Sequence, residues 1–499
     1  MKDDMPKSKT ILIACGTAAL LAIISAPQSI AQLAPSGTAG DRAVYTIGTT
    51  GVIADVNALP SSTLTHDFDT ETIADTANSF ELGAEGGVDD TKIFLTGGHH
   101  IVIYGQEWDG GGERSGADSY LKIGGSKVPY GHSAAYTRDG ANRESFTRGG
   151  TILNVAQGES LELESQRLDV FTQAADIGNR PLTMQNADVQ LIKLDDTNLE
   201  FLRLKAVTSP LLMAAGASGP AHVPYDSQDE IDAGSFGHST TVANDQITLK
   251  TPGHYLIFAN TGTTIATGNK RNNLTQKLFL DADGAGANPP VAIAGGATTA
   301  YLRHASVGDG VGGLIDEGAM SVGVLVEVTA ANSVLTVEIT RDATSASVDS
   351  TVTLDQIRTG LAIAKLPSYG DYISLGESGS TNNADINTAT ATARSFASNT
   401  GVSNDSFSYA PGTSASQIVV NKANDFLFLS SHHVEDYATP GGGVRTTVSQ
   451  GFQTTTGGAL SYGAGGSYNR DQPAGNQAAR DSGNWAGAII RGGTDVSVG

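Results

Sequence analysis

Short apolar runs separated by polar, glycine-containing turns dominate the chain, and no long amphipathic helical period interrupts them. The runs recur in three copies, each opening with a short apolar segment at 41–45, 199–204 and 371–375. A longer apolar run then follows a Ser-Phe pair at nearly the same distance in each copy, at 98–103, 253–258 and 424–429. This repetition predicts three similar domains built from strands.

Two kinds of strand are expected within a copy. The central run is apolar at successive positions, which is typical of a strand covered on both sides. A later run alternates, with Leu161 and Leu163 set against Glu162 and Glu164, and the second copy alternates in the same way over 335–340. A hydrophobic period of two residues indicates a strand with one face in the core and the other in water. The sequence therefore predicts an all-β fold of tandem jelly-roll-like antiparallel β-sandwich domains.

Domain boundaries follow from the closing strands, which end in Lys-Leu at 193–194 and 365–366. We expect β-sandwich repeats over residues 32–195, 196–367 and 368–499. An identical Arg-Gly-Gly-Thr at 148–151 and 491–494 aligns the third copy with the first, which continues to a closing strand. We therefore expect the third repeat to be truncated and the chain to be a fragment of a longer protein. The alternative is a terminal repeat that closes differently.

The N-terminus predicts a secretory signal peptide over residues 1–31. Lysines precede an apolar stretch at 11–24, and small residues lead to a cleavage site after Ala31. The apolar stretch is shorter than the roughly 20 residues of a membrane span. Cys15 is the only cysteine, so the mature protein would have no disulfide. We expect a secreted or cell-surface protein that does not span a membrane.

The composition narrows the range of partners. A net charge of −22 makes nucleic acid or an anionic membrane surface an unfavourable partner. Glycine accounts for 61 of 499 residues, which fits many turns between strands. Extracellular protein or glycan surfaces are the partners we expect.

Two segments resemble a known family. The run 253–258, Gly-His-Tyr-Leu-Ile-Phe, is similar to the Gly-x-Tyr-x-Phe strand of the C1q and tumour-necrosis-factor superfamily, and 158–163 is similar to its Gly-Asp-x-Val-x-Leu segment. The resemblance implies a jelly roll, homotrimers, binding through loops and outer strands, and in some members calcium. That family usually carries one such domain, whereas this chain has three in tandem.

A Tyr-x-Arg motif occurs in every copy and is the main binding candidate. Residues two apart on a strand face the same side, so the ring and the guanidinium can line a surface or stack against a neighbouring domain. A packing role in each repeat is the alternative, because a packing solution recurs wherever the fold recurs. The six residues are Tyr136, Arg138, Tyr301, Arg303, Tyr468 and Arg470.

Metal-binding candidates are fewer. Asp281 and Asp283 stand in a short acidic turn that could hold calcium, although the spaced ligand set of a specific loop is missing. His99 and His100 are adjacent, but neighbours on a strand point to opposite faces and do not readily share one ion. We expect no cofactor apart from possible calcium, and hydrogen bonding as the role of these histidines.

The sequence does not favour an enzyme. It contains no zinc-protease motif and no phosphate-cradling glycine loop, and Gly131-His-Ser-Ala134 lacks the second glycine of a nucleophile elbow. We name no catalytic residue. We expect a structural or adhesive protein that binds through multivalent weak contacts. The alternative is an array of carbohydrate- or protein-ligand-binding modules attached to a downstream catalytic or anchoring region.

Overall fold

The structure is a computed structural model of the 499-residue chain. It describes residues 17–21, 42–46, 63–68, 70–73, 79–83, 91–110, 115–137, 144–168, 182–194, 196, 199–266, 270–284, 289–304, 316–341, 350–366, 372–376, 398–402, 407–408, 417–421, 425–435, 445–454, 458–470 and 481–491. Within these ranges every regular element is a strand and every strand pairing is antiparallel. The predicted all-β sandwich class is confirmed.

The first repeat consists of two sheets packed face to face. Its inner sheet has the order β10 (Glu144–Val155), β7 (Gly98–Asp109), β12 (Thr183–Lys193), β2 (Arg42–Thr46), β4 (Thr70–Ile73). Its outer sheet has the order β5 (Phe80–Leu82), β6 (Ile93–Leu95), β11 (Ser160–Arg167), β8 (Ser115–Ile123), β9 (Ser126–Thr137), with β3 (Thr63–Thr65) paired to β11. Apolar side chains from both sheets, among them Val102, Trp108 and Leu163, form the core between them.

The second repeat has the same plan. Its inner sheet runs β22 (Glu317–Val328), β19 (Gly253–Ala266), β24 (Thr351–Leu366), β13 (Glu200–Lys205), β16 (Ser227–Ile231), with β14 (Leu211–Met213) also on β24. Its outer sheet runs β17 (Phe236–Gly237), β18 (Gln246–Leu249), β23 (Ser333–Arg341), β20 (Lys270–Asp281), β21 (Val291–His304), with β15 (Ala221–His222) on β23. The predicted opening, central, alternating and closing strands of both repeats are therefore present.

The third repeat departs from this plan in its inner sheet and in the pairing of its outer strands. Its inner sheet has the order β34 (Asp481–Arg491), β29 (Asp425–Glu435), β1 (Thr17–Leu21), β25 (Tyr372–Gly376), β26 (Ser398–Val402). The strand β1, from the predicted signal peptide, thus occupies the place that the closing strands β12 and β24 occupy in the other repeats. The remaining described strands form the pairs β27 (Phe407–Ser408) with β28 (Val419–Val420), β30 (Arg445–Gln450) with β33 (Gly465–Arg470), and β31 (Gln453–Thr454) with β32 (Gly458–Ala459).

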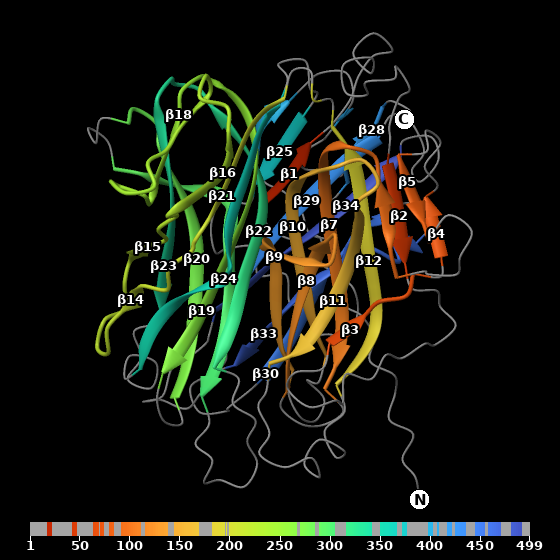
Figure 1. Ribbon diagram of the computed structural model, residues 1–499, viewed down its shortest axis with the longest axis horizontal. Coiled ribbons are helices and arrows are strands. Elements are labelled where there is room, and N and C mark those ends of the chain that lie inside the picture. The colour runs from red at the N-terminus through yellow and green to blue at the C-terminus, as the bar shows by residue number, and fades with distance from the viewer. Residues whose placement is uncertain are drawn as a thin grey trace, which may run out of the picture.

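The three inner sheets face one another. In Figure 1 the orange and green repeats stand side by side, and the blue strands of the third lie behind them. Alternate residues of the central strands point away from their own sandwich into a shared apolar cluster, here called the three-repeat cluster. Its members are Ile101, Ile103, Ile152, Ile192, Leu194, Phe201, Leu256, Phe258, Leu325, Ala362, Ala364, Leu366, Leu427, Leu429, Trp485 and Ile489. The central strands are covered on both sides, as expected, but the second cover is the neighbouring repeats.

Equivalent glycines make room for the large rings of this cluster. Gly150, Gly323 and Gly487 pair with Ile103, Phe258 and Leu429, which occupy the same position in the three central runs. A Cβ at Gly150 or Gly323 would lie 2.6 or 2.7 Å from a ring carbon of Phe258, and one at Gly487 would lie 2.8 Å from Trp485. The close approach of the three sheets therefore requires glycine at this position.

Strand pairing corrects the alignment by the Arg-Gly-Gly-Thr motif. Arg148 lies opposite Gly105 on β7, whereas Arg491 lies opposite Asp425, the first residue of β29. Trp485, opposite Ser431, is the structural counterpart of Arg148. The two identical tetrapeptides are therefore not equivalent in the fold.

The polar face of β11 is also less exposed than its alternation predicts. Glu162 and Glu164 are only 8% and 6% exposed. Lys122 Nζ lies 2.6 Å from Glu164 Oε1, and the Tyr120 hydroxyl donates to Glu164 Oε2 at 2.9 Å. Long polar side chains of the neighbouring strand β8 thus shield this face from water.

Candidate functional site at the junction of the three repeats

The tyrosines of the three Tyr-x-Arg motifs meet one another. They lie on β9, β21 and β33, the edge strands at corresponding places in the three repeats. The ring centroids of Tyr136 and Tyr301 are 4.9 Å apart, those of Tyr136 and Tyr468 5.5 Å, and those of Tyr301 and Tyr468 5.7 Å. This tyrosine triangle marks a pseudo-threefold axis, because equivalent residues of three repeats contact each other in all three pairs.

A cavity of about 50 Å³ lies beside the tyrosine triangle. All three repeats line it, with Ser145 and Phe146 from the first, Glu317 from the second and Asn484 from the third. The volume suits one or two waters or a small ion rather than an organic ligand. The axis therefore offers a small polar site, and the three tyrosines are among the residues that line it.

The arginines of the motif are described unequally. Arg303 is 6% exposed, and its Nε and Nη1 atoms have no hydrogen-bond partner among the residues that the structure describes. Arg470 ends β33, but its side chain lies outside the described residues, as does all of Arg138. The structure thus brings the three tyrosines together and describes one of the three guanidiniums. A binding role for these six residues stays a prediction.

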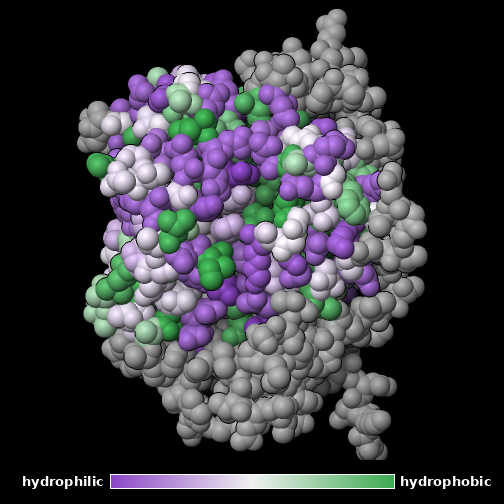
Figure 2. Space-filling view, viewed as in Figure 1, coloured by the Kyte–Doolittle hydropathy of each residue, from purple (hydrophilic) through white to green (hydrophobic). Residues whose placement is uncertain are grey.

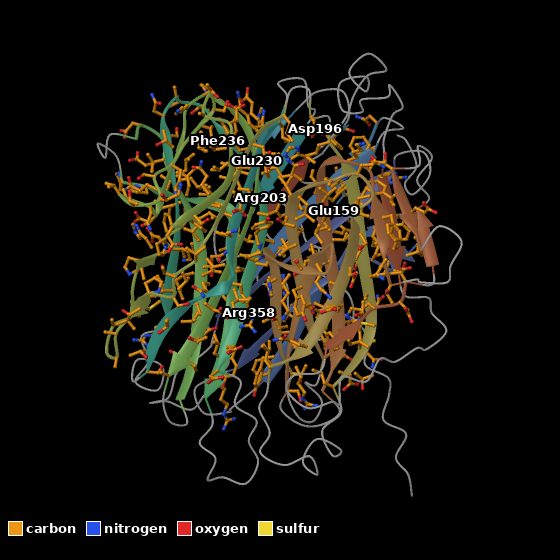
Figure 3. All side chains as sticks on the ribbon, in the orientation of Figure 1. Glu159, Asp196, Arg203, Glu230, Phe236 and Arg358 are labelled. Atoms are coloured by element: carbon orange, nitrogen blue, oxygen red, sulfur yellow. The ribbon has the colours of Figure 1, made fainter. Side chains whose placement is uncertain are left out.

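His99 connects the first two repeats through two carboxylates. Its Nδ1 lies 2.6 Å from Asp196 Oδ1, and its Nε2 lies 3.0 Å from Oε1 of Glu230, on β16 of the second repeat. Asn154 donates to the same oxygen of Glu230 at 3.1 Å, and the ring of Phe201 packs edge-on against the imidazole. Figure 3 shows Asp196 and Glu230 near each other between the orange and green repeats. A protonated His99 is thus paired on both nitrogens.

This pairing predicts that part of the stability is lost in mild alkali. Burial lowers the pKa of His99, but the bonds to Asp196 and Glu230 outweigh burial and raise the pKa to about 9, from 6.5. Between these values the folded state binds more protons than the unfolded state, so the stabilisation present below pH 6.5 is lost as the pH rises towards 9. We expect urea midpoints of the wild type to fall across this range relative to those of His99→Gln.

Comparison with the variant is necessary because other buried groups titrate as well. Burial raises the pKa of Glu107 to about 7 and lowers that of His100 to about 4, and both groups are present in the two proteins. If the urea midpoints of wild type and His99→Gln changed in the same way with pH, His99 would not be charged in the folded state. A Glu230→Gln variant removes one of the two carboxylates and should show an intermediate slope.

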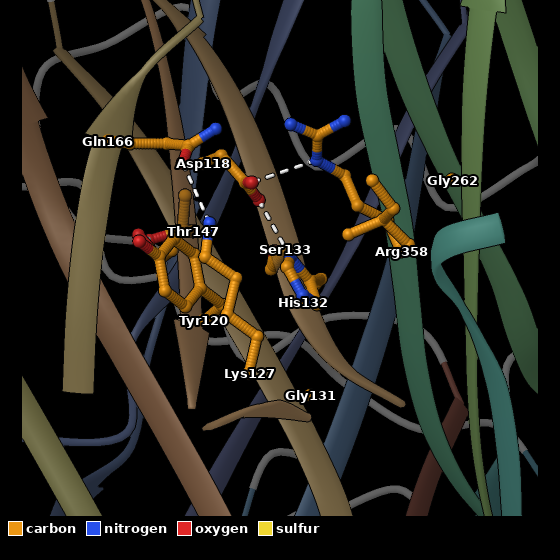
Figure 4. A network of polar contacts seen from close by, with 12 residues as sticks. Asp118, Tyr120, Lys127, Gly131, His132, Ser133, Thr147, Gln166, Gly262 and Arg358 are labelled. Atoms are coloured by element: carbon orange, nitrogen blue, oxygen red, sulfur yellow. Dashed lines mark hydrogen bonds and ion pairs between the residues drawn. The ribbon is translucent and has the colours of Figure 1, made fainter. Parts of the chain in front are cut away.

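A second link between the first two repeats is a buried ionic network (Figure 4). Arg358 on β24 donates from Nε to Oδ2 of Asp118 on β8 at 2.8 Å, and Asp118 is 0% exposed. His132 Nδ1 lies 3.3 Å from the other carboxylate oxygen, and the Tyr120 ring stacks on the imidazole. Burial raises the pKa of Asp118, but Arg358 outweighs burial and holds that pKa below its usual value. The carboxylate is therefore ionised and depends on a cation from another repeat.

The first and third repeats are joined by hydrogen bonds to backbone. Arg148 pairs with Asp188 within the first repeat and donates from Nε to the carbonyl of Ala464 at 2.9 Å. Gln190 donates to the carbonyl of Gly487 at 2.9 Å and accepts from the amide of Ile489 at 2.7 Å. These contacts fix the register of β12 against β34. Sequence reasoning missed them, because Gln190 does not recur and the Arg-Gly-Gly-Thr motif aligned Arg148 with Arg491, which is not its counterpart in the fold.

The calcium candidates form a turn. Oδ1 of Asp281 accepts hydrogen bonds from the amides of Asp283 at 3.2 Å and Gly284 at 3.3 Å, an arrangement that stabilises the turn after β20. Among the residues that the structure describes, no group of three or more His, Cys, Asp or Glu side chains is arranged to hold a metal ion. His100 binds the carbonyl of Thr96 at 2.7 Å, away from the partners of His99.

Comparisons with known proteins identify no family for this chain. No family description and no curated protein matches the chain. Among solved structures, murine APRIL at pH 5.0 is 12% identical, with a TM-score of 0.23, over 34% of this chain and all of that one. Murine APRIL at pH 8.0 gives 11% identity and a TM-score of 0.22 over the same shares. APRIL is a jelly roll of the tumour-necrosis-factor family.

Membrane-spanning helices are not found in the described part of the chain, where no helix has the length and apolar character to cross a bilayer.

Proposed function

We propose that this chain is a secreted or cell-surface protein with a structural or adhesive role. Its three sandwiches would act as one rigid unit, here called the head. The observation that carries the proposal is the three-repeat cluster, because an apolar core shared by three repeats holds them at fixed positions. The trimer that the family resemblance implies among three chains has a counterpart here within one chain. We therefore propose that the head works as a monomer.

Fixed geometry suits recognition of an extended surface. Three similar domains around one axis would repeat any binding surface at constant spacing, so a first weak contact would raise the effective concentration of the next. The described surface in Figure 2 is mostly hydrophilic with small scattered apolar groups, which fits polar contacts better than one large apolar interface. Extracellular protein or glycan surfaces are the partners that this geometry and the net charge of −22 favour.

A binding comparison at two valencies tests the proposal. The full chain would be applied to glycan and extracellular-matrix protein arrays, first as a soluble protein and then displayed on beads, after sedimentation velocity has established its mass. We expect weak binding of a monomer and binding at least about tenfold stronger on beads. Equal apparent affinity in the two formats, or saturable turnover of an offered substrate, would contradict a multivalent adhesive role.

A further inference from the structure

Two buried hydrogen-bond donors lie close together on β21, beside the pseudo-threefold axis. The hydroxyl of Tyr301 is buried, as are Nε and Nη1 of Arg303, and none of these atoms has a hydrogen-bond partner among the described residues. The whole side chain of Arg303 is enclosed, since the residue is only 6% exposed. Buried polar groups are nearly always hydrogen-bonded, and buried charges are paired. These donors therefore require an acceptor that the described residues do not supply.

The face of β21 that carries these donors points between the repeats. Leu302, which stands between them in the sequence, belongs to the core of the second sandwich, so Tyr301 and Arg303 point away from that core. Tyr301 belongs to the tyrosine triangle and lines the cavity of about 50 Å³. On the same face, the Thr299 hydroxyl donates to the carbonyl of Gly483 at 3.2 Å and accepts from its amide at 2.7 Å. The second repeat therefore meets the third along this face.

The balance of charge at the cavity favours a negative ligand. Among the described residues that line it, Glu317 is the only one with a charged side chain. Its Oε2 lies 2.9 Å from Nη1 of Arg358, and burial raises the pKa of this carboxyl although the guanidinium opposes the rise. Glu317 thus has a cation of its own, whereas Nε and Nη1 of Arg303 have no acceptor in the described part of the chain. A water could accept these hydrogen bonds, but only an anion would also balance the buried charge.

We propose that Arg303 and Tyr301 form a binding site for a small anion, of the size of formate or chloride, next to the tyrosine triangle. The guanidinium supplies the charge and charge-assisted hydrogen bonds, and the hydroxyl supplies a further donor. The adjoining cavity of about 50 Å³ sets the size limit, because it has room for a small ion but not for a sugar ring or a peptide. A bound anion stabilises the docked arrangement of the repeats. This site does not depend on the adhesive role of the head.

Stability in two salts tests the site. Urea midpoints of the full chain and of Arg303→Met would be measured at one pH in sodium gluconate, whose anion is too large for the cavity, and in sodium formate of the same ionic strength. In gluconate we expect Arg303→Met to be at least as stable as the wild type, because the variant lacks a buried unpaired cation. Formate should raise the midpoint of the wild type in a saturable manner and leave that of Arg303→Met unchanged. An equal response of the two proteins to formate would overturn the proposal.

A milder variant keeps the test decisive if Arg303→Met folds poorly. Tyr301→Phe keeps the ring in the tyrosine triangle but removes the donor, so the formate concentration at half-effect should rise about threefold to tenfold. Tyr225→Phe is the matched control, because the Tyr225 hydroxyl is also buried without a partner among the described residues but lies in the core of the second sandwich. We expect Tyr225→Phe to respond to formate as the wild type does. Equal weakening by both variants would exclude Tyr301 as a ligand of the anion.

A second arm distinguishes a free anion from an anionic group on a larger partner. Formate and a sulfated disaccharide would each be titrated into the wild type and Arg303→Met by isothermal titration calorimetry. We expect heat from formate with the wild type, its loss in Arg303→Met, and no heat from the disaccharide that depends on Arg303. Binding of the disaccharide through Arg303 without binding of formate would overturn the proposal of a small free anion.

Discussion

Trp485→Ala should lower the free energy of unfolding by about 3–5 kcal/mol and loosen the third repeat from the other two. The indole is 0% exposed and belongs to the third repeat, yet it packs against Phe258 of the second, with ring centroids 6.1 Å apart. Removing it leaves a cavity in an interior that the other repeats cannot readily fill. Urea unfolding followed by circular dichroism would measure the loss, and limited proteolysis would detect the loosening.

Trp108→Ala is the matched control for this prediction. Trp108 is equally buried but lies in the core of the first sandwich alone. We expect a comparable loss of stability confined to the first repeat, with proteolysis concentrated there. Trp485→Ala should instead give a second unfolding transition and release fragments that separate at the repeat boundaries. Identical proteolysis patterns for the two variants would show that the three-repeat cluster does not couple the repeats.

The sandwich class and the strand positions could be predicted from the sequence because alternation and apolar runs are local signals. The run around Ile101 and Ile103 shows that both faces of its strand are covered. It does not show what covers the second face, since a second sheet and a neighbouring repeat require the same apolar residues. The arrangement of the three repeats around one axis therefore could not be predicted from the apolar pattern of the sequence.

The tyrosine triangle was partly predictable. Recurrence identified Tyr136, Tyr301 and Tyr468 as equivalent, and their meeting follows once three equivalent edges face one axis. Gly150, Gly323 and Gly487 also recur at equivalent positions. The Arg-Gly-Gly-Thr match, however, placed the third copy in the wrong register. Short identical peptides arise by chance in a glycine-rich chain, whereas strand pairing fixes equivalence.

Contacts between different repeats at unique positions left no signal in the sequence. Asp118 and Arg358 are 240 residues apart, and the three copies do not repeat the pair. His99 was correctly expected to form hydrogen bonds, but its partners, Asp196 and Glu230, both come from the second repeat. Such pairs depend on how the domains dock, which local periodicity does not encode.

Arg358→Met should cost about 3–5 kcal/mol, because it leaves the carboxylate of Asp118 buried without its cation. Arg358 Nη1 also lies 2.9 Å from Glu317 Oε2 and pairs with Asp355. One substitution therefore leaves several acidic groups between two repeats without their cation. The measurement is the urea unfolding free energy at pH 7. Arg358 holds the pKa of Asp118 below its usual value in the folded state. The difference in unfolding free energy between wild type and Arg358→Met should therefore shrink as the pH falls through this lowered pKa and Asp118 becomes protonated.

A double variant separates the loss of a favourable pair from the penalty of an unpaired charge. Asp118→Asn combined with Arg358→Met removes both charges, and we expect it to recover most of the stability that Arg358→Met loses. Lys205→Met is the surface control, since Lys205 and Asp229 are 2.8 Å apart but their side chains are 30% and 21% exposed. That change should cost no more than about 1 kcal/mol. If Arg358→Met cost as little, burial would not be what makes the link between the first two repeats strong.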